Sequence, residues 1–184
     1  MSGNKVIKSE VVNSKKIFKG KIIDVFHDEI TLPDGRTALR EIIKRGNASA
    51  IIPVDNEGNI IFVKQYRHPA KDCVLEIPAG MLEEGEDPLL CAKRELEEET
   101  SYKTNNIKLL TKMYSAIGFC DEQIYIYLAT ELSQGKFNLD EDEFIEVEKY
   151  SLEDSIQMIF DGKIVDSKTM VAILAYNALV KADK

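Results

Sequence analysis

The feature that most constrains this chain is a strongly acidic segment, residues 80–102, in which Lys93 and Arg94 are the only basic side chains. Within it, Asp87 suits a helix N-cap and Pro88 is favourable at the first helical position. The apolar positions that then recur with helical spacing are Leu89, Ala92 and Leu96. The segment therefore predicts an amphipathic helix that packs one face against a core.

The carboxylates of this helix gather on a second face. Glu95, Glu98 and Glu99 stand at i, i+3 and i+4, so their side chains are neighbours. Because like charges at this spacing repel, the cluster favours a positive partner, and oxygen-rich clusters suit hard cations such as Mg²⁺ or Mn²⁺. The spacing alone leaves open an ordinary acidic helix exposed to solvent.

Strands are predicted on both sides of the helix, where β-branched and aromatic residues alternate roughly with polar ones. The strand predictions cover residues 16–32, 37–45, 49–55, 59–68, 74–78, 108–118 and 122–132, with turn signals at 32–36 and 56–59. One further helix is predicted from a cap formed by Ser151 and Asp154 to about Phe160, and another starts at Asp166. Strands mixed with helices in this way predict an α/β or α+β domain.

Composition excludes several classes of protein. The 184 residues suffice for one globular domain with one sizeable core. A net charge of −8 argues against general binding of nucleic acid, and no apolar run is long enough to span a membrane. Two histidines make a zinc site unexpected. The cysteines, which lack metal-ligand spacing and are expected as free thiols in the cytoplasm, are Cys73, Cys91 and Cys120.

The order of residues in the acidic segment resembles the Nudix box, the signature of the Nudix hydrolases. The pattern is a glycine, a glutamate after five residues, and an Arg-Glu-apolar-any-Glu-Glu run after seven more. The residues that carry the match are Gly80, Glu86, Arg94, Glu95, Glu98 and Glu99. One position departs, since Ser101 stands where the family has a glycine, whose expected role is a left-handed helix C-cap. Serine adopts that conformation at a cost of about 1 kcal/mol.

This resemblance implies the fold and the domain organisation. The fold class is α/β, a Nudix-type α/β/α sandwich with a mixed sheet, preceded by an N-terminal antiparallel strand region. Residues 1–45 are expected to form that strand region and to dimerise, and residues 46–184 to form the Nudix hydrolase domain.

The resemblance also implies an activity, the metal-dependent hydrolysis of a nucleoside diphosphate linked to another group. The expected metal is Mg²⁺, with Mn²⁺ as a substitute. The implied ligands, of which the first two are the principal ones, are Glu95, Glu99, Glu98 and the main-chain carbonyl of Ala79. Arg94 is expected to orient these carboxylates by ion pairing, with Glu86 or Glu98 as its partner.

Sequence outside the box resembles the ADP-ribose pyrophosphatase group of this family. The matching stretches are VLEIPAGMLEEGE, LREIIKRGNASAIIPVD, VKQYRHP and YSAIGFCDEQIYIYLA, the last with Ile117 where the group has proline. By this resemblance Arg67 meets the phosphates and Phe18 the adenine. The full set of expected substrate contacts is Phe18, Arg40, Glu41, Arg45, Arg67, Met81 and Gly118. Each arginine alone is typical of a surface strand, but together they supply the local cations that an anionic substrate needs in an acidic protein.

A second acidic segment, residues 139–144, resembles the loop that carries the catalytic base in this group. A metal-activated water needs a carboxylate to accept its proton, and Glu141 is the first choice for that base. Glu143 is expected as a metal ligand from the same loop, and the two roles stay exchangeable here. With Arg94 and Glu98, Glu141 completes the expected catalytic set, and in-line attack of hydroxide on ADP-ribose would give AMP and ribose 5-phosphate. A solvated acidic loop is the alternative.

The resembled group consists of homodimers in which N-terminal strands of one subunit help to build the other's site. Residues 16–45 are rich in apolar side chains that need burial, so we predict a homodimer, with folding of these strands onto their own domain as the alternative. The expected partners are a small-molecule nucleoside diphosphate sugar and a second copy of the chain. Two other functions stay open, a pyrophosphatase for a different nucleoside diphosphate sugar and a catalytically silent Nudix module that binds a nucleotide.

Overall fold

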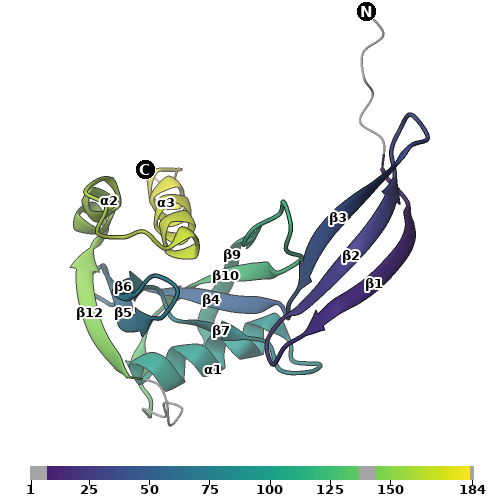
Figure 1. Ribbon diagram of the computed structural model, residues 1–184. Helices are drawn as coiled ribbons and strands as arrows, with labels where there is room; N and C mark the ends of the chain where they lie inside the picture. Colours follow the sequence, from purple (N-terminus) through teal and green to yellow (C-terminus); the bar gives the residue numbers. More distant parts are fainter. Residues whose placement is uncertain (1–7, 137–143, 183–184) are drawn as a thin grey trace, which may run out of the picture. The chain divides into compact units, whose positions relative to one another are not determined.

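The computed structural model describes residues 8–136 and 144–182, which fall into two compact units (Figure 1). The first unit contains the chain up to Gly46 together with Tyr114–Glu122. The second contains Asn47–Met113 and the chain from Gln123 onward, and it includes the acidic helix.

The first unit is built on a three-stranded antiparallel sheet in the order β1-β2-β3. Its strands are β1 (Val11–Lys19), β2 (Asp24–Thr31) and β3 (Thr37–Lys44). Residues 16–32 thus contribute to two strands, because the chain reverses after Gly20, whose N–H donates to the carbonyl of Ile23 at 2.8 Å. The predicted turn at residues 32–36 is confirmed, with Gly35 at a φ of 82°.

Apolar side chains stay exposed on this sheet. Every residue of β1 is exposed, and the large exposed apolar residues of β1, β3 and their connections are Val11, Val12, Ile17, Phe18, Ile22 and Leu39. The segment Tyr114–Glu122 joins the same unit at the end of β3, where the N–H of Ile43 donates to the carbonyl of Phe119 at 2.7 Å. A sheet with this much exposed apolar surface is a candidate for pairing with another chain.

The second unit contains a four-stranded mixed sheet. In spatial order its strands are β7 (Ala79–Met81), β4 (Ala48–Pro53), β10 (Gln123–Thr130) and β9 (Asn106–Tyr114). The central strand β4 runs parallel to β10 and antiparallel to β7. All six residues of β4 are buried, as expected for a strand that is covered on both faces.

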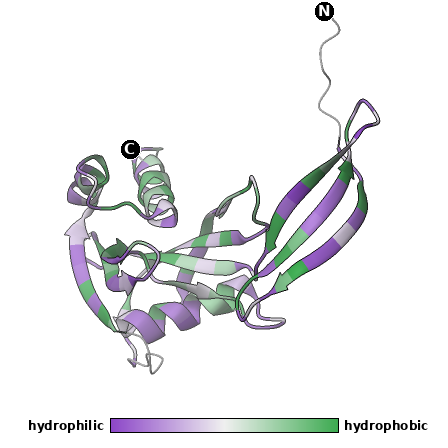
Figure 2. Cartoon of the chain, in the orientation of Figure 1, coloured by the Kyte–Doolittle hydropathy of each residue, from purple (hydrophilic) through white to green (hydrophobic). Residues whose placement is uncertain are grey.

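Two helices cover the opposite faces of this sheet. Ile51 belongs to a cluster with Ala92 and Leu96 of α1 (Pro88–Thr100). Its neighbour Ile52 belongs to a separate cluster with Ala172 and Ile173 of α3 (Ser167–Ala182). Because successive strand residues point to opposite faces, α1 and α3 lie on different sides, which gives the expected sandwich of helix, sheet and helix. Figure 2 shows hydrophilic residues along much of α1, in contrast to the hydrophobic β4 and α3.

A second antiparallel sheet has the order β12-β5-β6. Its strands are β12 (Ile145–Ser151), β5 (Asn59–Arg67) and β6 (Asp72–Glu76), and a short pair consists of β8 (Tyr102–Lys103) and β11 (Ser133–Gln134). The predicted strand at 74–78 is wrong at its end, because β6 stops at Glu76 and β7 starts only at Ala79. The sequence prediction also lacked β12.

The helix starts follow the predicted caps. The Asp87 side chain accepts the N–H of Leu89 at 2.8 Å before α1, and Ser151 accepts the N–H of Asp154 at 3.0 Å before α2 (Leu152–Phe160). Asp166 accepts the N–H of Thr169 at 3.0 Å at the start of α3. Among residues 8–136 and 144–182, no helix is long and apolar enough to cross a membrane.

Candidate active site

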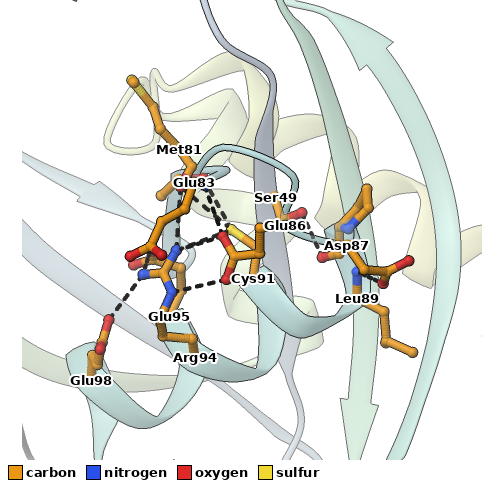
Figure 3. A network of polar contacts seen from close by, with 12 residues as sticks. Ser49, Met81, Glu83, Glu86, Asp87, Leu89, Cys91, Arg94, Glu95 and Glu98 are labelled. Atoms are coloured by element: carbon orange, nitrogen blue, oxygen red, sulfur yellow. Dashed lines mark hydrogen bonds and ion pairs between the residues drawn. The ribbon is translucent and has the colours of Figure 1, made fainter.

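Arg94 is the centre of the polar network at the acidic helix (Figure 3). Its Nε and Nη2 donate to the two carboxylate oxygens of Glu86 at 3.1 and 3.0 Å. Its Nη1 donates to Glu95 Oε1 at 2.6 Å and to Glu98 Oε2 at 3.1 Å. The predicted ion pairs with Glu86 and Glu98 are therefore both present, and the pair with Glu95 is an addition.

The electrostatics of this network follow from its geometry. The hydrogen bond from Arg94 holds the pKa of Glu86 below its ordinary value, against the opposing effect of burial. In turn, the hydrogen bond to Glu86 raises the pKa of Arg94 above its ordinary value. One guanidinium faces three carboxylates, so the group keeps a surplus of negative charge.

Gly80 is required by the position of Glu95. A Cβ atom at residue 80 would lie 1.8 Å from Oε1 of Glu95, a distance that real Cβ contacts do not reach. The Glu95 carboxylate thus lies directly against the main chain of β7, and this residue is only 8% exposed. The glycine at the start of the box is explained by this close approach.

Glu99, like Glu95, contacts the main chain of β7. Its Oε2 accepts the N–H of Ala79 at 3.0 Å, and the residue is 2% exposed. The carbonyl expected as a metal ligand belongs to the same Ala79. The helix and β7 therefore bring Glu95, Glu99 and Ala79 close together, and their role as metal ligands stays a prediction.

Cys91 contacts the main chain of β7, a role that the sequence prediction did not include. Its Sγ lies 3.6 Å from the carbonyl oxygen of Gly80, 3.7 Å from that of Met81, and 3.5 Å from Nη2 of Arg94. Burial raises the pKa of this thiol to about 11, so it stays protonated near neutral pH. Its position three residues before Arg94, which puts both on one helical face, was the signal for it in the sequence.

Ser101 closes the helix in the conformation expected of the family's glycine. Its φ is 58°, and its N–H donates to the carbonyl of Glu97 at 3.0 Å, which is a left-handed C-cap. The side chain adds a contact that glycine lacks, because Nε2 of Gln134 donates to Ser101 Oγ at 3.1 Å. This hydrogen bond offsets part of the backbone cost of serine.

The remaining predicted substrate residues of the second unit lie on β5 and β7. Nε and Nη2 of Arg67 donate to the two carboxylate oxygens of Glu76 at 2.7 and 2.9 Å. The Met81 side chain is exposed, and its carbonyl accepts from Nη2 of Arg94 at 3.3 Å. Contact of Arg67 and Met81 with substrate stays a prediction.

The other predicted substrate residues belong to the first unit, where they remain predictions. Arg40 and Glu41 are exposed on β3, with Nη1 of Arg40 on the carbonyl of Leu39 and Glu41 3.7 Å from Nε2 of His27. Nε of Arg45 lies 3.0 Å from Oε1 of Glu122. The other two, both exposed, are Phe18 and Gly118. Glu141 and Glu143 lie outside the described residues.

The chemistry of the donor set fits a hard divalent cation. Carboxylate and carbonyl oxygens are the donors that Mg²⁺ and Mn²⁺ prefer, and the surplus negative charge around Arg94 calls for a further cation. Within the part of the chain that the structure describes, no three acidic, histidine or cysteine side chains stand together in a metal-binding arrangement. The carboxylates of Glu86, Glu95 and Glu98 are turned toward the guanidinium instead.

Comparison with known proteins bears on this site and fold. The chain is 43% identical over 171 residues, 92% of each chain, to a protein from Bacillus subtilis (strain 168) named ADP-ribose pyrophosphatase. It is 40% identical over 171 residues, again 92% of each chain, to a protein from Bacillus methanolicus named methanol dehydrogenase activator. A solved structure described as an ADP compounds hydrolase matches the fold with a TM-score of 0.86 over 97% of each chain, at 19% identity. The family model described as NUDIX domain matches residues 44–170, most of the chain, and this protein therefore belongs to the NUDIX family, the Nudix hydrolases.

Proposed function

We propose that this Nudix hydrolase cleaves the diphosphate of ADP-ribose and releases AMP and ribose 5-phosphate. The observation that carries the proposal is the Arg94 network, in which one guanidinium gathers the carboxylates of Glu86, Glu95 and Glu98. It is supported by the relative that is 43% identical over 92% of the chain and is named ADP-ribose pyrophosphatase.

Nudix hydrolases generally depend on a divalent metal ion, and the ion proposed here is Mg²⁺, which Mn²⁺ can replace. The proposed ligands are the carbonyl of Ala79 and the carboxylates of Glu95, Glu98, Glu99 and Glu143. A bound divalent ion neutralises diphosphate oxygens and lowers the pKa of an attacking water. The support for this set is its chemistry, because every donor is an oxygen atom.

The chain's own residues have distinct proposed roles in the reaction. Arg94 holds the carboxylates in place. Because it makes a separate hydrogen bond to each of three carboxylates, one of them can turn to a metal ion while the others stay bound to Arg94. Glu141 accepts the proton of the attacking water, with Glu143 as its alternate. Arg67 binds a phosphate, and Met81 and Gly118 line the substrate site.

The proposed assembly is a homodimer in which residues 1–45 dimerise and residues 46–184 form the hydrolase domain. The exposed apolar side chains of β1 and β3 support pairing with a second chain. Arg40 or Glu41 of one chain would then form part of the adenine site of the other. Mixing inactive Arg40→Ala chains with inactive Glu99→Gln chains should restore activity, because one site of the mixed dimer carries neither defect. A monomer by sedimentation, or no recovery despite proven subunit exchange, refutes the shared site.

The proposed location is the cytoplasm, which the three free cysteines support. Two alternatives differ in substrate or in activity, namely a pyrophosphatase for another nucleoside diphosphate sugar and a module that binds a nucleotide without hydrolysis. The complete set of charged box residues argues against the silent module.

A substrate panel with Mg²⁺ tests the proposal. ADP-ribose, a GDP-sugar and a UDP-sugar are each incubated with the protein, and nucleotide products are separated by chromatography. The expected result is AMP from ADP-ribose at the highest kcat/KM of the panel. Faster cleavage of another nucleotide sugar would show that ADP-ribose is not the preferred substrate. Nucleotide binding without any product would show that the protein is not an enzyme for these substrates.

A further inference from the structure

An ionic cluster lies at the junction of β5, β6 and α3, next to the start of the box. Glu76 accepts from Arg67 at 2.7 and 2.9 Å and from Nζ of Lys168 at 2.5 Å. Nζ of Lys168 also donates to Oδ2 of Asp166 at 3.0 Å. We call Arg67, Glu76, Asp166 and Lys168 the Glu76 cluster.

Holding α3 against the sheet with this cluster has a high cost in desolvation free energy. The side chain of Glu76 is 4% exposed and that of Lys168 is 12% exposed, so both charges have lost most of their water. Lys168 also stands in the first turn of α3, where the helix dipole disfavours a cation. Apolar residues would dock α3 at equal or lower cost, so stability alone does not account for the cluster.

Arg67 is the member of the Glu76 cluster that is most exposed to solvent. Its side chain is 42% exposed, far more than those of Glu76 and Lys168. The pKa of Arg67 is raised by its hydrogen bond to Glu76 first, and the charge of Glu99 contributes as well. The chain after Glu76 leads in three residues to Ala79, whose N–H binds Glu99.

The charges within the cluster explain why Lys168 is needed. Two carboxylates and two cations balance one another in the intact cluster. Without Lys168, the carboxylates of Glu76 and Asp166 would outweigh the single charge of Arg67. An Arg67 surrounded by surplus negative charge would attract a phosphate poorly.

We propose that Glu76 and Lys168 are positioning residues that hold Arg67 ready for a phosphate of the substrate. Glu76 fixes the plane of the guanidinium through two hydrogen bonds, and Lys168 cancels the charge that would otherwise repel the phosphate. The inference rests on the proposed function, hydrolysis of a nucleoside diphosphate with Arg67 as a phosphate contact.

A double-mutant cycle tests the proposal. Lys168→Gln keeps a hydrogen-bond donor near Glu76 but removes the charge. We expect KM for ADP-ribose, and Kd for ADP-ribose in EDTA by calorimetry, to rise about tenfold while kcat changes by less than about threefold. Lys168→Arg should bring both constants back to within about threefold of wild type. In an Arg67→Gln background, Lys168→Gln should change Kd by less than about twofold.

Matched controls separate positioning from stability. Lys181→Gln makes the same substitution in the last turn of the same helix and should leave KM and Kd unchanged. The unfolding midpoint of each variant is measured by circular dichroism. If Lys168→Gln does not fold, the cycle is run with Lys168→Met, which also removes the charge and whose effect on Kd must likewise vanish in the Arg67→Gln background. Unchanged Kd in a folded Lys168→Gln variant, or an equal loss in both backgrounds, overturns the proposal.

The cycle can fail independently of the proposed function. If wild-type protein does not hydrolyse ADP-ribose, the proposed substrate is wrong, but that result does not decide the positioning role of Glu76 and Lys168. The same variants are therefore also titrated with inorganic pyrophosphate in EDTA, which offers the same phosphate oxygens to Arg67. Weaker pyrophosphate binding in Lys168→Gln, dependent on Arg67, supports the positioning role, and equal binding refutes it.

Discussion

Replacing Gly80 by alanine is expected to disable the site through a single steric contact. The backbone of Gly80 is not in the positive-φ region, so alanine adds no backbone strain. Its Cβ would lie 1.8 Å from Oε1 of Glu95, where contacts under 3.0 Å force a shift, so the carboxylate must move by at least about 1 Å. A displacement of about 1 Å in a positioned group costs about a hundredfold in rate.

The same movement breaks the hydrogen bond between Arg94 and Glu95, which is 2.6 Å long. Loss of a charged hydrogen bond costs about 1.5–3 kcal/mol, which for a chain of this size lowers Tm by about 3–12 °C. We therefore expect Gly80→Ala to reduce kcat for ADP-ribose about a hundredfold in a protein that remains folded at 25 °C. Steady-state kinetics and thermal unfolding measure the two effects.

Gly58→Ala is the matched control, because it strains the backbone without touching the site. Gly58 has a φ of 84°, and a Cβ there meets nothing within 4 Å. It should cost about 1 kcal/mol of stability and leave kcat unchanged. In a Glu95→Gln background, Gly80→Ala should add little further loss. Full activity of Gly80→Ala would refute the placement of Glu95 against β7.

Three further predictions concern the cap at Ser101, the ion pairs of Glu76 and the acidic segment at residues 139–144. Ser101→Gly removes the left-handed strain but also the hydrogen bond from Gln134, so the free energy of unfolding in urea should change by less than about 1 kcal/mol, and a loss above about 2 kcal/mol contradicts the cap. Burial opposes ionisation of Glu76, but Arg67 and Lys168 hold its pKa below the ordinary 4.5 in the folded state, so its contribution to stability is present above 4.5 and is lost as pH falls through the folded pKa. In the Glu76→Gln variant, the free energy of unfolding in urea should therefore fall less steeply with decreasing pH than in wild type. If the two plots of this free energy against pH are parallel, Glu76 is not the group responsible. Glu141→Gln should lower kcat with little change in the Mg²⁺ requirement, whereas Glu143→Gln should raise the Mg²⁺ concentration needed; wild-type behaviour of both variants moves the base elsewhere.

The carboxylate face was predictable from spacing, but its burial was not. Glu95, Glu98 and Glu99 share a helical face by their separation alone. Their distances to the backbone depend on β7, which lies against α1 through the hydrogen bond from Ala79 to Glu99. No local sequence pattern encodes that contact. The glycine at position 80 is the one residue in the sequence that indicates a close approach to β7.

Long-range pairing also explains the errors in the strand prediction. Residues 74–78 were predicted as one strand, but the N–H of Ile77 leaves the sheet and donates to Thr169 Oγ1 on α3 at 2.9 Å. Pro78 has no N–H to continue a ladder. β12 was missed because it follows directly on the acidic segment at residues 139–144, and its pairing with β5 joins distant segments such as Val147 and Val63.

Metal-dependent hydrolysis of ADP-ribose requires both a divalent ion and the box carboxylates, and one kinetic comparison measures both requirements. AMP release is measured with Mg²⁺ for wild type, Glu98→Gln and Glu99→Gln, and for wild type in excess EDTA, with circular dichroism to verify folding. Both substitutions remove charge while preserving shape, so each should lower kcat by orders of magnitude in a folded protein, and EDTA should abolish activity. Wild-type rates in EDTA, or in both variants, would contradict metal-dependent hydrolysis by these carboxylates.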